Sequence, residues 1–272
     1  MAMENHIIDW NQAWKEIRNK TAAKSRGLQF WDKKPKYDAG PTTDEDYSNA
    51  FLEIMDPGPD WSVLDMACGT GALAVPLAKK VKSVTAVDFS SNMLDMLDCR
   101  CKSEGISNVK MIQGSWEDDW DSIGIEEHDV AIASRSLVVE DLHAAISKLH
   151  KIARKKVYIS TILGDGPHDR RIFKAVGREL HPGPDYIYNY NLLYQMGIQA
   201  NVRIIKEVRK KSYAAMEDAF NNIRWMMGGT SDEEDVKLTA YLKKHLVYRN
   251  KQWSLDYQNI IRWAVMWWEK EN

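Results

Sequence analysis

Two glycines and a distant aspartate, all within residues 63–90, have types and spacing that suit a nucleotide-like ligand. Gly69 and Gly71 lie between an apolar run and a helix-like run, and with Ala74 they satisfy the pattern G-x-G-x-x-G/A. Asp88 ends the next apolar run, at the distance where dinucleotide-binding enzymes place an acid. The stretch therefore allows two hypotheses: a dinucleotide that carries hydride, or a nucleoside cofactor that carries a methyl group.

Features around the glycines favour the nucleoside. Asp65 lies four residues before Gly69, inside the end of an apolar run. A carboxylate there could accept hydrogen bonds from a cationic amine, whereas it would repel a pyrophosphate. The sequence QGSW, residues 113–116, offers a small turn and an aromatic face for an adenine. Helices and a polar loop before residue 60 could fold over the ligand.

The surrounding chain predicts strands and helices in alternation. Such alternation indicates parallel strands with right-handed crossovers, an open sheet that binds ligands outside the carboxyl ends of its strands. Two amphipathic helices are expected first, at 4–24 and 44–55. Strands are then expected at 61–66, 83–88, 108–113, 128–134 and 155–162, separated by helices at about 71–80, 91–104 and 138–153.

After residue 163 this rhythm breaks. Helical patterns at about 168–180, 188–198, 215–227 and 232–246 surround a strand-like run at 201–214, and a second run at 259–270 closes the chain.

Three stretches now carry a family resemblance. VLDMACGTGALAVPLA, VTAVDFSSNML and VKMIQGSWED resemble motifs one to three of class I S-adenosylmethionine-dependent methyltransferases, over about residues 50–163. The resemblance implies an α/β fold: a Rossmann-like, seven-stranded, mostly parallel sheet with helices on both faces and a helical cap. The last two strands would form an antiparallel pair. We expect N-terminal helices and a lid loop at 1–55 and a methyltransferase domain at 56–272, with helical cap insertions at about 164–200 and 215–255.

The resemblance also implies which residues bind S-adenosylmethionine. Asp65 matches the acid near the methionine amine, and Asp88 matches the acid that holds both ribose hydroxyls, for which a carboxylate is a suitable double acceptor. The methionine moiety would be lined by the loop residues Ala67, Cys68, Gly69 and Gly71. The remaining expected contacts are Phe89 and Met93 beside the adenine, Gly114, Ser115 and Trp116 at its edge, Ser134 and Arg135 toward the methionine end and the substrate, and Trp31 and Tyr37 on the lid loop.

Some of these positions have simpler interpretations. Asp88 could be a helix N-cap, and Phe89, Met93 and Trp116 could be packing residues. The family often has Asp where this chain has Ser115. The sequence ASRSL follows the fourth expected strand in place of an Asn-Pro-Pro-aromatic motif, which argues against methylation of exocyclic base amines or of glutamine amides.

No fixed catalytic signature is expected, because an activated methyl group mainly needs alignment and exclusion of water. The candidate general bases are Glu140, Asp141, His143, His181 and Tyr190. We predict no metal site, because Cys99 and Cys101 would point to different sides of a helix and no metal-binding motif is present.

The whole chain has the composition of a soluble globular protein. Its 272 residues carry a formal net charge of −2, which favours no polyanionic partner, and its 3 cysteines suit a reducing compartment. The basic residues at 148–156 are read as the end of a helix. We expect a cytoplasmic enzyme with a small-molecule substrate, no nucleic-acid or membrane partner and a possible homodimer. The alternatives are an NAD-dependent oxidoreductase and a non-catalytic S-adenosylmethionine-binding module.

Overall fold

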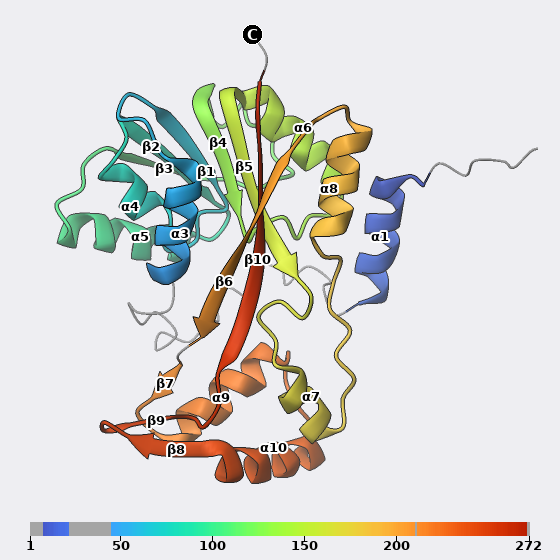
Figure 1. The fold of residues 1–272 in the computed structure, drawn as a ribbon. Coiled ribbons are helices and arrows are strands. Elements are labelled where there is room, and N and C mark those ends of the chain that lie inside the picture. Colours follow the sequence, from blue (N-terminus) through green and yellow to red (C-terminus); the bar gives the residue numbers. More distant parts are fainter. Residues whose placement is uncertain (1–7, 22–44, 210, 271–272) are drawn as a thin grey trace, which may run out of the picture.

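The architecture is a mixed sheet with helices on both faces and a smaller cap (Figure 1). The structure is a computed structural model and describes residues 8–21, 45–209 and 211–270. Seven strands are ordered β3-β2-β1-β4-β5-β10-β6. Their bounds are β1 Ser62–Met66, β2 Ser83–Asp88, β3 Val109–Gln113, β4 His128–Ser134, β5 Ala153–Leu163, β6 Asn201–Arg209 and β10 Asn259–Glu269.

The first five strands are parallel, and β10 is antiparallel to both β5 and β6. The chain crosses from one side of β1 to the other, so the order reverses between β1 and β4. At that point Asp65 of β1 lies between Ala86 of β2 and Ile132 of β4. This is the position where open parallel sheets bind their ligands.

Two apolar layers cover the sheet. On one face pack α3 (Glu45–Met55), α4 (Ala74–Ala78) and α5 (Ser91–Ser103), which bury Phe51, Leu77 and Leu97. The other face is covered by α6 (Leu142–Ile152) and α8 (Tyr186–Gln195), with α1 (Trp10–Lys20) packed beside them. The predicted fold class is therefore confirmed, down to the antiparallel pair formed by β6 and β10.

The cap lies beyond the carboxyl end of β5 (Figure 1). It contains α7 (Arg170–Val176), α9 (Met216–Met226), α10 (Asp232–His245) and a small sheet ordered β7-β9-β8, with bounds Ser212–Tyr213, Gln252–Leu255 and Leu246–Arg249. Its core includes Ile172, Ile223 and Leu238 and forms a cluster separate from the two layers of the main sheet.

Two expectations about the cap need correction. The insertion at 215–255 is not wholly helical, because residues 246–255 form the hairpin of β8 and β9. Within 164–200, α8 packs on the main sheet and is not part of the cap, since Leu192 and Leu193 are buried in the apolar layer of that sheet.

The expected helix at 71–80 starts only at Ala74, because the glycine turn takes up the residues before it.

Candidate functional site

The carboxyl end of β1 holds a buried acid. Asp65 is 2% exposed, and its Oδ2 has no hydrogen-bond partner among the described residues. Burial, and then the negative charge of Asp88, raise the pKa of Asp65 to about 7, while a backbone hydrogen bond at Ala74 and the charge of Arg135 act in the opposite direction. A buried carboxyl oxygen without a donor is costly, so this position suits a ligand that brings a donor or a positive charge.

The loop after β1 is formed by left-handed backbone. Ala67, Gly69 and Gly71 have φ of +59°, +54° and +79°. A Cβ on Gly71 would lie 2.3 Å from Leu97 Cδ1, so α5 packs too closely for any side chain there. Among the described residues, no atom lies within 4 Å of a Cβ placed on Gly69. Gly71 is thus needed for packing, whereas Gly69 leaves open space beside the loop.

Asp88 connects three loops at the end of β2. Its Oδ2 accepts a hydrogen bond from Gly69 N at 2.8 Å, and its Oδ1 accepts one from Ser90 N at 3.0 Å. Its carbonyl accepts from Gly114 N at 3.0 Å. The N-cap of α5 is Ser90, which accepts from Met93 N, so the simpler interpretation of Asp88 as that cap is wrong.

The turn after β3 is held by its own hydrogen bonds. Ser115 N donates to Asp118 Oδ2 at 2.7 Å, and Trp120 Nε1 donates to the Ser115 carbonyl at 3.0 Å. Trp116 is half-buried against the apolar layer of α6 and α8 and lies 5.7 Å from the Trp120 ring, centroid to centroid. Met93 is buried and Phe89 half-buried. Packing therefore accounts for part of the surface of each of these residues.

A cluster of hydroxyls and aromatic rings lies at the ends of β4 and β5. The Tyr47 hydroxyl shares hydrogen bonds with Ser134 Oγ at 2.7 Å and with Ser160 Oγ at 2.6 Å. Arg135 N donates to Ser160 Oγ at 3.0 Å. The guanidinium carbon of Arg135 lies 4.2 Å from the Tyr47 ring centre and 5.5 Å from that of Trp263. Ser134 and Arg135 are thus brought together with residues of three other elements.

Three members of this cluster are absent from the residues expected from sequence. Tyr47 is on α3, Ser160 on β5 and Trp263 on β10, and each reaches the cluster only through tertiary packing. Trp263 Nε1 donates to the buried Glu207 Oε2 at 2.8 Å, which fixes the indole from the side of β6. No local pattern joins these positions. The order of the strands is the signal that could have found them.

The candidate bases lie apart from this cluster. Glu140 and His143 are exposed, and His181 pairs loosely with Glu179 at 3.6 Å. Asp141 caps α6 and binds Lys15 at 2.7 Å, a contact that helps to lower the pKa of Asp141 despite partial burial. Tyr190 packs on α8 against the main sheet. A catalytic role for these residues remains a prediction.

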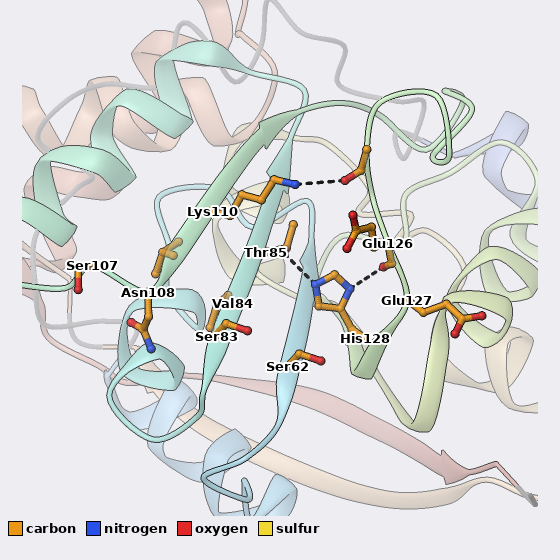
Figure 2. A pocket seen from close by; sticks show the side chains of 12 residues that line it. Ser62, Ser83, Val84, Thr85, Ser107, Asn108, Lys110, Glu126, Glu127 and His128 are labelled. Carbon is orange, nitrogen blue, oxygen red and sulfur yellow. Dashed lines mark hydrogen bonds between the residues drawn. The ribbon is translucent and has the colours of Figure 1, made fainter.

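A hollow at the opposite edge of the sheet is a different feature. This pocket has a volume of about 420 Å³. It lies at the amino ends of β1 to β4 (Figure 2). The ring nitrogens of His128 are both engaged, by the Glu126 carbonyl at 2.7 Å and Thr85 Oγ1 at 2.8 Å, and burial lowers the pKa of this histidine. Lys110 Nζ donates to the Gly124 carbonyl. These polar groups hold the strand ends together, and the candidate site stays at the carboxyl edge.

Some expectations fall outside the structure. Trp31 and Tyr37 lie outside the described residues. Within the described ranges, the acids, histidines and cysteines form no group of three or more that could hold a metal ion. None of the described helices has the length and apolar character needed to cross a membrane.

Known proteins resemble this chain in sequence and in fold. Residues 63–156 match a family model described as a methyltransferase domain. An uncharacterised protein of Haemophilus influenzae is 35% identical over 226 residues, which cover 82% of this chain and 81% of that protein. A 23S rRNA (uracil(1939)-C(5))-methyltransferase of Pseudomonas fluorescens is 39% identical, but over only 23% of this chain and 13% of its own.

Solved structures share the fold. A provisionally assigned methyltransferase of Bacillus halodurans aligns with a TM-score of 0.57 at 16% identity, covering 83% of this chain and 99% of its own. At this identity the likeness concerns the fold alone.

Proposed function

Because this chain belongs to the class I S-adenosylmethionine-dependent methyltransferases, we propose that it methylates a small-molecule acceptor at the carboxyl edge of its sheet. Its cofactor is S-adenosylmethionine. We further propose which residues bind this cofactor and which class of acceptor receives the methyl group.

The proposed site rests on the buried Oδ2 of Asp65, for which the described residues offer no hydrogen-bond donor. This oxygen is buried next to a loop whose Gly69 leaves open space. The methionine part of the cofactor brings an ammonium group, which supplies both the donor and the positive charge that a buried carboxylate requires. Asp65 would therefore hold the amine, with the backbone of Ala67 to Gly71 around it.

Asp88 fits the ribose. Each of its carboxylate oxygens accepts one backbone N–H, and a carboxylate offers about four lone-pair sites in total. A carboxylate is a double acceptor, which suits the two adjacent hydroxyls of a ribose. The backbone bonds fix the carboxylate in place before the ligand arrives, which reduces the entropy lost on binding.

The protein itself has little to add to the chemistry of methyl transfer. S-adenosylmethionine supplies a methyl group on a positively charged sulfur, already activated for displacement. The chain must hold the acceptor in line and keep water away. The cluster of Tyr47, Ser134, Arg135 and Ser160 lies at the ends of β4 and β5, next along the sheet from Asp65, where an acceptor would be placed.

The surface charges support a small acceptor over RNA. Lys148 Nζ donates to the carbonyls of Trp116 and Asp118, and Lys155 and Arg154 both lie beside Asp129. These contacts use much of the basic cluster at 148–156 for internal pairing, and a phosphate backbone would have to compete with them. The similarity to rRNA methyltransferases of this type covers 23% to 40% of this chain.

Transfer of a labelled methyl group tests the proposal. The enzyme would be incubated with methyl-tritiated S-adenosylmethionine and either a deproteinised bacterial metabolite extract or total RNA made without modifications. We expect label in the metabolite fraction and loss of transfer in Asp88→Asn. The matched control is Asp98→Asn, at an exposed aspartate of α5 that pairs with Lys102. Label in RNA, with none in metabolites, would contradict the proposal.

A further inference from the structure

Arg18 is a buried cation in the last turn of α1. It lies on the same face of the helix as Trp14 and is only 8% exposed. Its Nε is buried without a hydrogen-bond partner, and its guanidinium forms no ion pair with any of the described residues. Arginine stays charged in proteins, and a buried charge is costly unless a group of opposite charge pairs with it. The position therefore suits an anion that the described part of the chain does not supply.

Packing of the side-chain stem does not explain this burial. A long cationic side chain commonly lays its stem on apolar surface and keeps its charged head in water. Lys15, one turn earlier on α1, is exposed in this way: its side chain is 35% exposed, and its Nζ pairs with Asp141 at 2.7 Å. Arg18 is more deeply buried than Lys15, so it has the greater need of a counter-charge.

The direction of α1 places Arg18 toward the carboxyl edge of the sheet. Trp10 N, at the start of α1, donates to Gln195 Oε1 at 3.2 Å, at the end of α8. The two helices pack side by side and run in opposite directions (Figure 1), so Arg18 lies toward the beginning of α8. Because α8 leads into β6, which is parallel to β5, α8 begins at the carboxyl edge.

The same face of α1 contacts the loop that follows β4. Trp14 Nε1, one turn before Arg18, donates to the Val139 carbonyl at 3.0 Å. In that loop Ser136 Oγ donates to the Met66 carbonyl at 3.2 Å, at the end of β1. A chain of contacts thus leads from α1 to the strand end where the cofactor is proposed to bind. Arg18 lies on the side of this loop where an acceptor would be placed.

We propose that Arg18 binds a carboxylate of the methyl acceptor, so that the enzyme acts on an acidic small molecule. This inference rests on the proposed function and names the class of its substrate. The planar guanidinium matches a carboxylate with two parallel hydrogen bonds. A carboxylate also balances the single charge of one arginine, whereas a phosphate dianion would add a second negative charge to an edge that already holds Asp65 and Asp88.

Methyl transfer to chemically altered extracts tests the substrate class. A deproteinised bacterial metabolite extract is divided into a mock-treated part, a part amidated with carbodiimide and ammonium chloride, and a part treated with alkaline phosphatase. We expect label from methyl-tritiated S-adenosylmethionine in the mock-treated and phosphatase-treated parts, and at least a tenfold smaller amount in the amidated part. Undiminished transfer to the amidated part would overturn the proposal, as would loss after phosphatase treatment alone. No transfer to the mock-treated part would instead contradict the proposed function.

Variants of α1 test whether Arg18 causes this selectivity. The proteins are the wild type, Arg18→Gln, Arg18→Lys and the control Lys20→Gln, which removes an exposed charge from the same last turn. Arg18→Gln should raise the amount of extract needed for half-maximal transfer about tenfold or more, with Arg18→Lys intermediate and Lys20→Gln unchanged. Calorimetry should show equal affinity for S-adenosylhomocysteine in all four proteins. Unchanged transfer by Arg18→Gln, or weaker binding of S-adenosylhomocysteine by it, would overturn the proposal.

Thermal unfolding separates a binding role from a structural one. Replacing buried charge by an apolar side chain of similar size is often neutral or stabilising. Arg18→Met should therefore keep the Tm of the wild type or raise it by up to about 4 °C, while it loses transfer as Arg18→Gln does. A lower Tm in Arg18→Met would show that Arg18 supports the fold, and this result would overturn the proposal.

Discussion

At the scale of single residues, the site depends on two aspartates in different environments. Asp65 is buried, and its Oδ2 has no hydrogen-bond partner in the part of the chain that the structure describes, whereas both oxygens of Asp88 accept backbone N–H groups. Burial favours the protonated form of Asp65, while two backbone N–H groups hold the carboxylate of Asp88 in place.

The pKa of Asp65, about 7, predicts a pH-dependent affinity. An ammonium group pairs with the ionised carboxylate, so binding below pH 7 must first remove a proton from Asp65. The dissociation constant of S-adenosylhomocysteine should therefore be about tenfold higher at pH 6 than at pH 8. Calorimetry at both values checks this. Methylthioadenosine, without the amine, should show little change, and a flat profile for both ligands would show that Asp65 does not bind the amine.

The two loop glycines predict contrasting variants. Gly71→Ala places a methyl group against Leu97, so it should lower the free energy of unfolding by about 1–3 kcal/mol more than Gly69→Ala does. Gly69→Ala should lower the free energy of unfolding by about 1–2 kcal/mol, because alanine is strained in this left-handed backbone. Denaturant unfolding measures both. Equal losses would show that α5 moves aside without cost.

At the scale of elements, much could be predicted from sequence. The strands that carry Asp65, Asp88 and Ser134 follow from apolar runs that end at polar residues, and β2 and β4 begin and end at the expected positions. The cap hairpin could not be predicted in this way. Its turn uses Asn250 and Lys251, both at positive φ, and Lys251 lacks the glycine that usually marks such a turn.

That hairpin offers a stabilising substitution. Lys251 has φ of +63°, which a glycine adopts without steric cost. Lys251→Gly should therefore raise the free energy of unfolding of the cap by about 1 kcal/mol. Lys243→Gly, inside α10, should lower it by a similar amount, because glycine weakens helices. Chemical denaturation of both variants tests the pair, and destabilisation by both would contradict the turn geometry.

Arg178 links segments of the cap to one another. Arg178 binds both carboxylate oxygens of Glu234, at 2.5 and 2.7 Å, and also the carbonyls of Met227 and Gly229. Arg178→Gln should therefore speed amide exchange in α7, α9 and α10 and leave β1 to β5 protected, because the cap has its own core. Hydrogen-exchange mass spectrometry checks this. Equal acceleration throughout would show that the cap and the sheet unfold together.

At the scale of the whole molecule, the strand order explains why the site could be predicted only in part. The order β3-β2-β1-β4-β5-β10-β6 gathers the motif residues at one edge, and the motifs themselves indicate that half of the site. The other half combines Tyr47, Ser160 and Trp263 from distant segments, and only the folded sheet brings them to Arg135. The possible homodimer, the lid and the cytoplasmic location remain predictions.

The central claim is that the loop after β1 and the end of β2 bind the nucleoside of S-adenosylmethionine. Calorimetric titration with S-adenosylhomocysteine and with NAD tests it most directly, on the wild type, Asp88→Asn and the control Asp98→Asn. We predict binding of S-adenosylhomocysteine alone, weakened about tenfold to a hundredfold in Asp88→Asn and unchanged in Asp98→Asn. Binding of NAD alone, or equal affinity in Asp88→Asn and the wild type, would contradict the account.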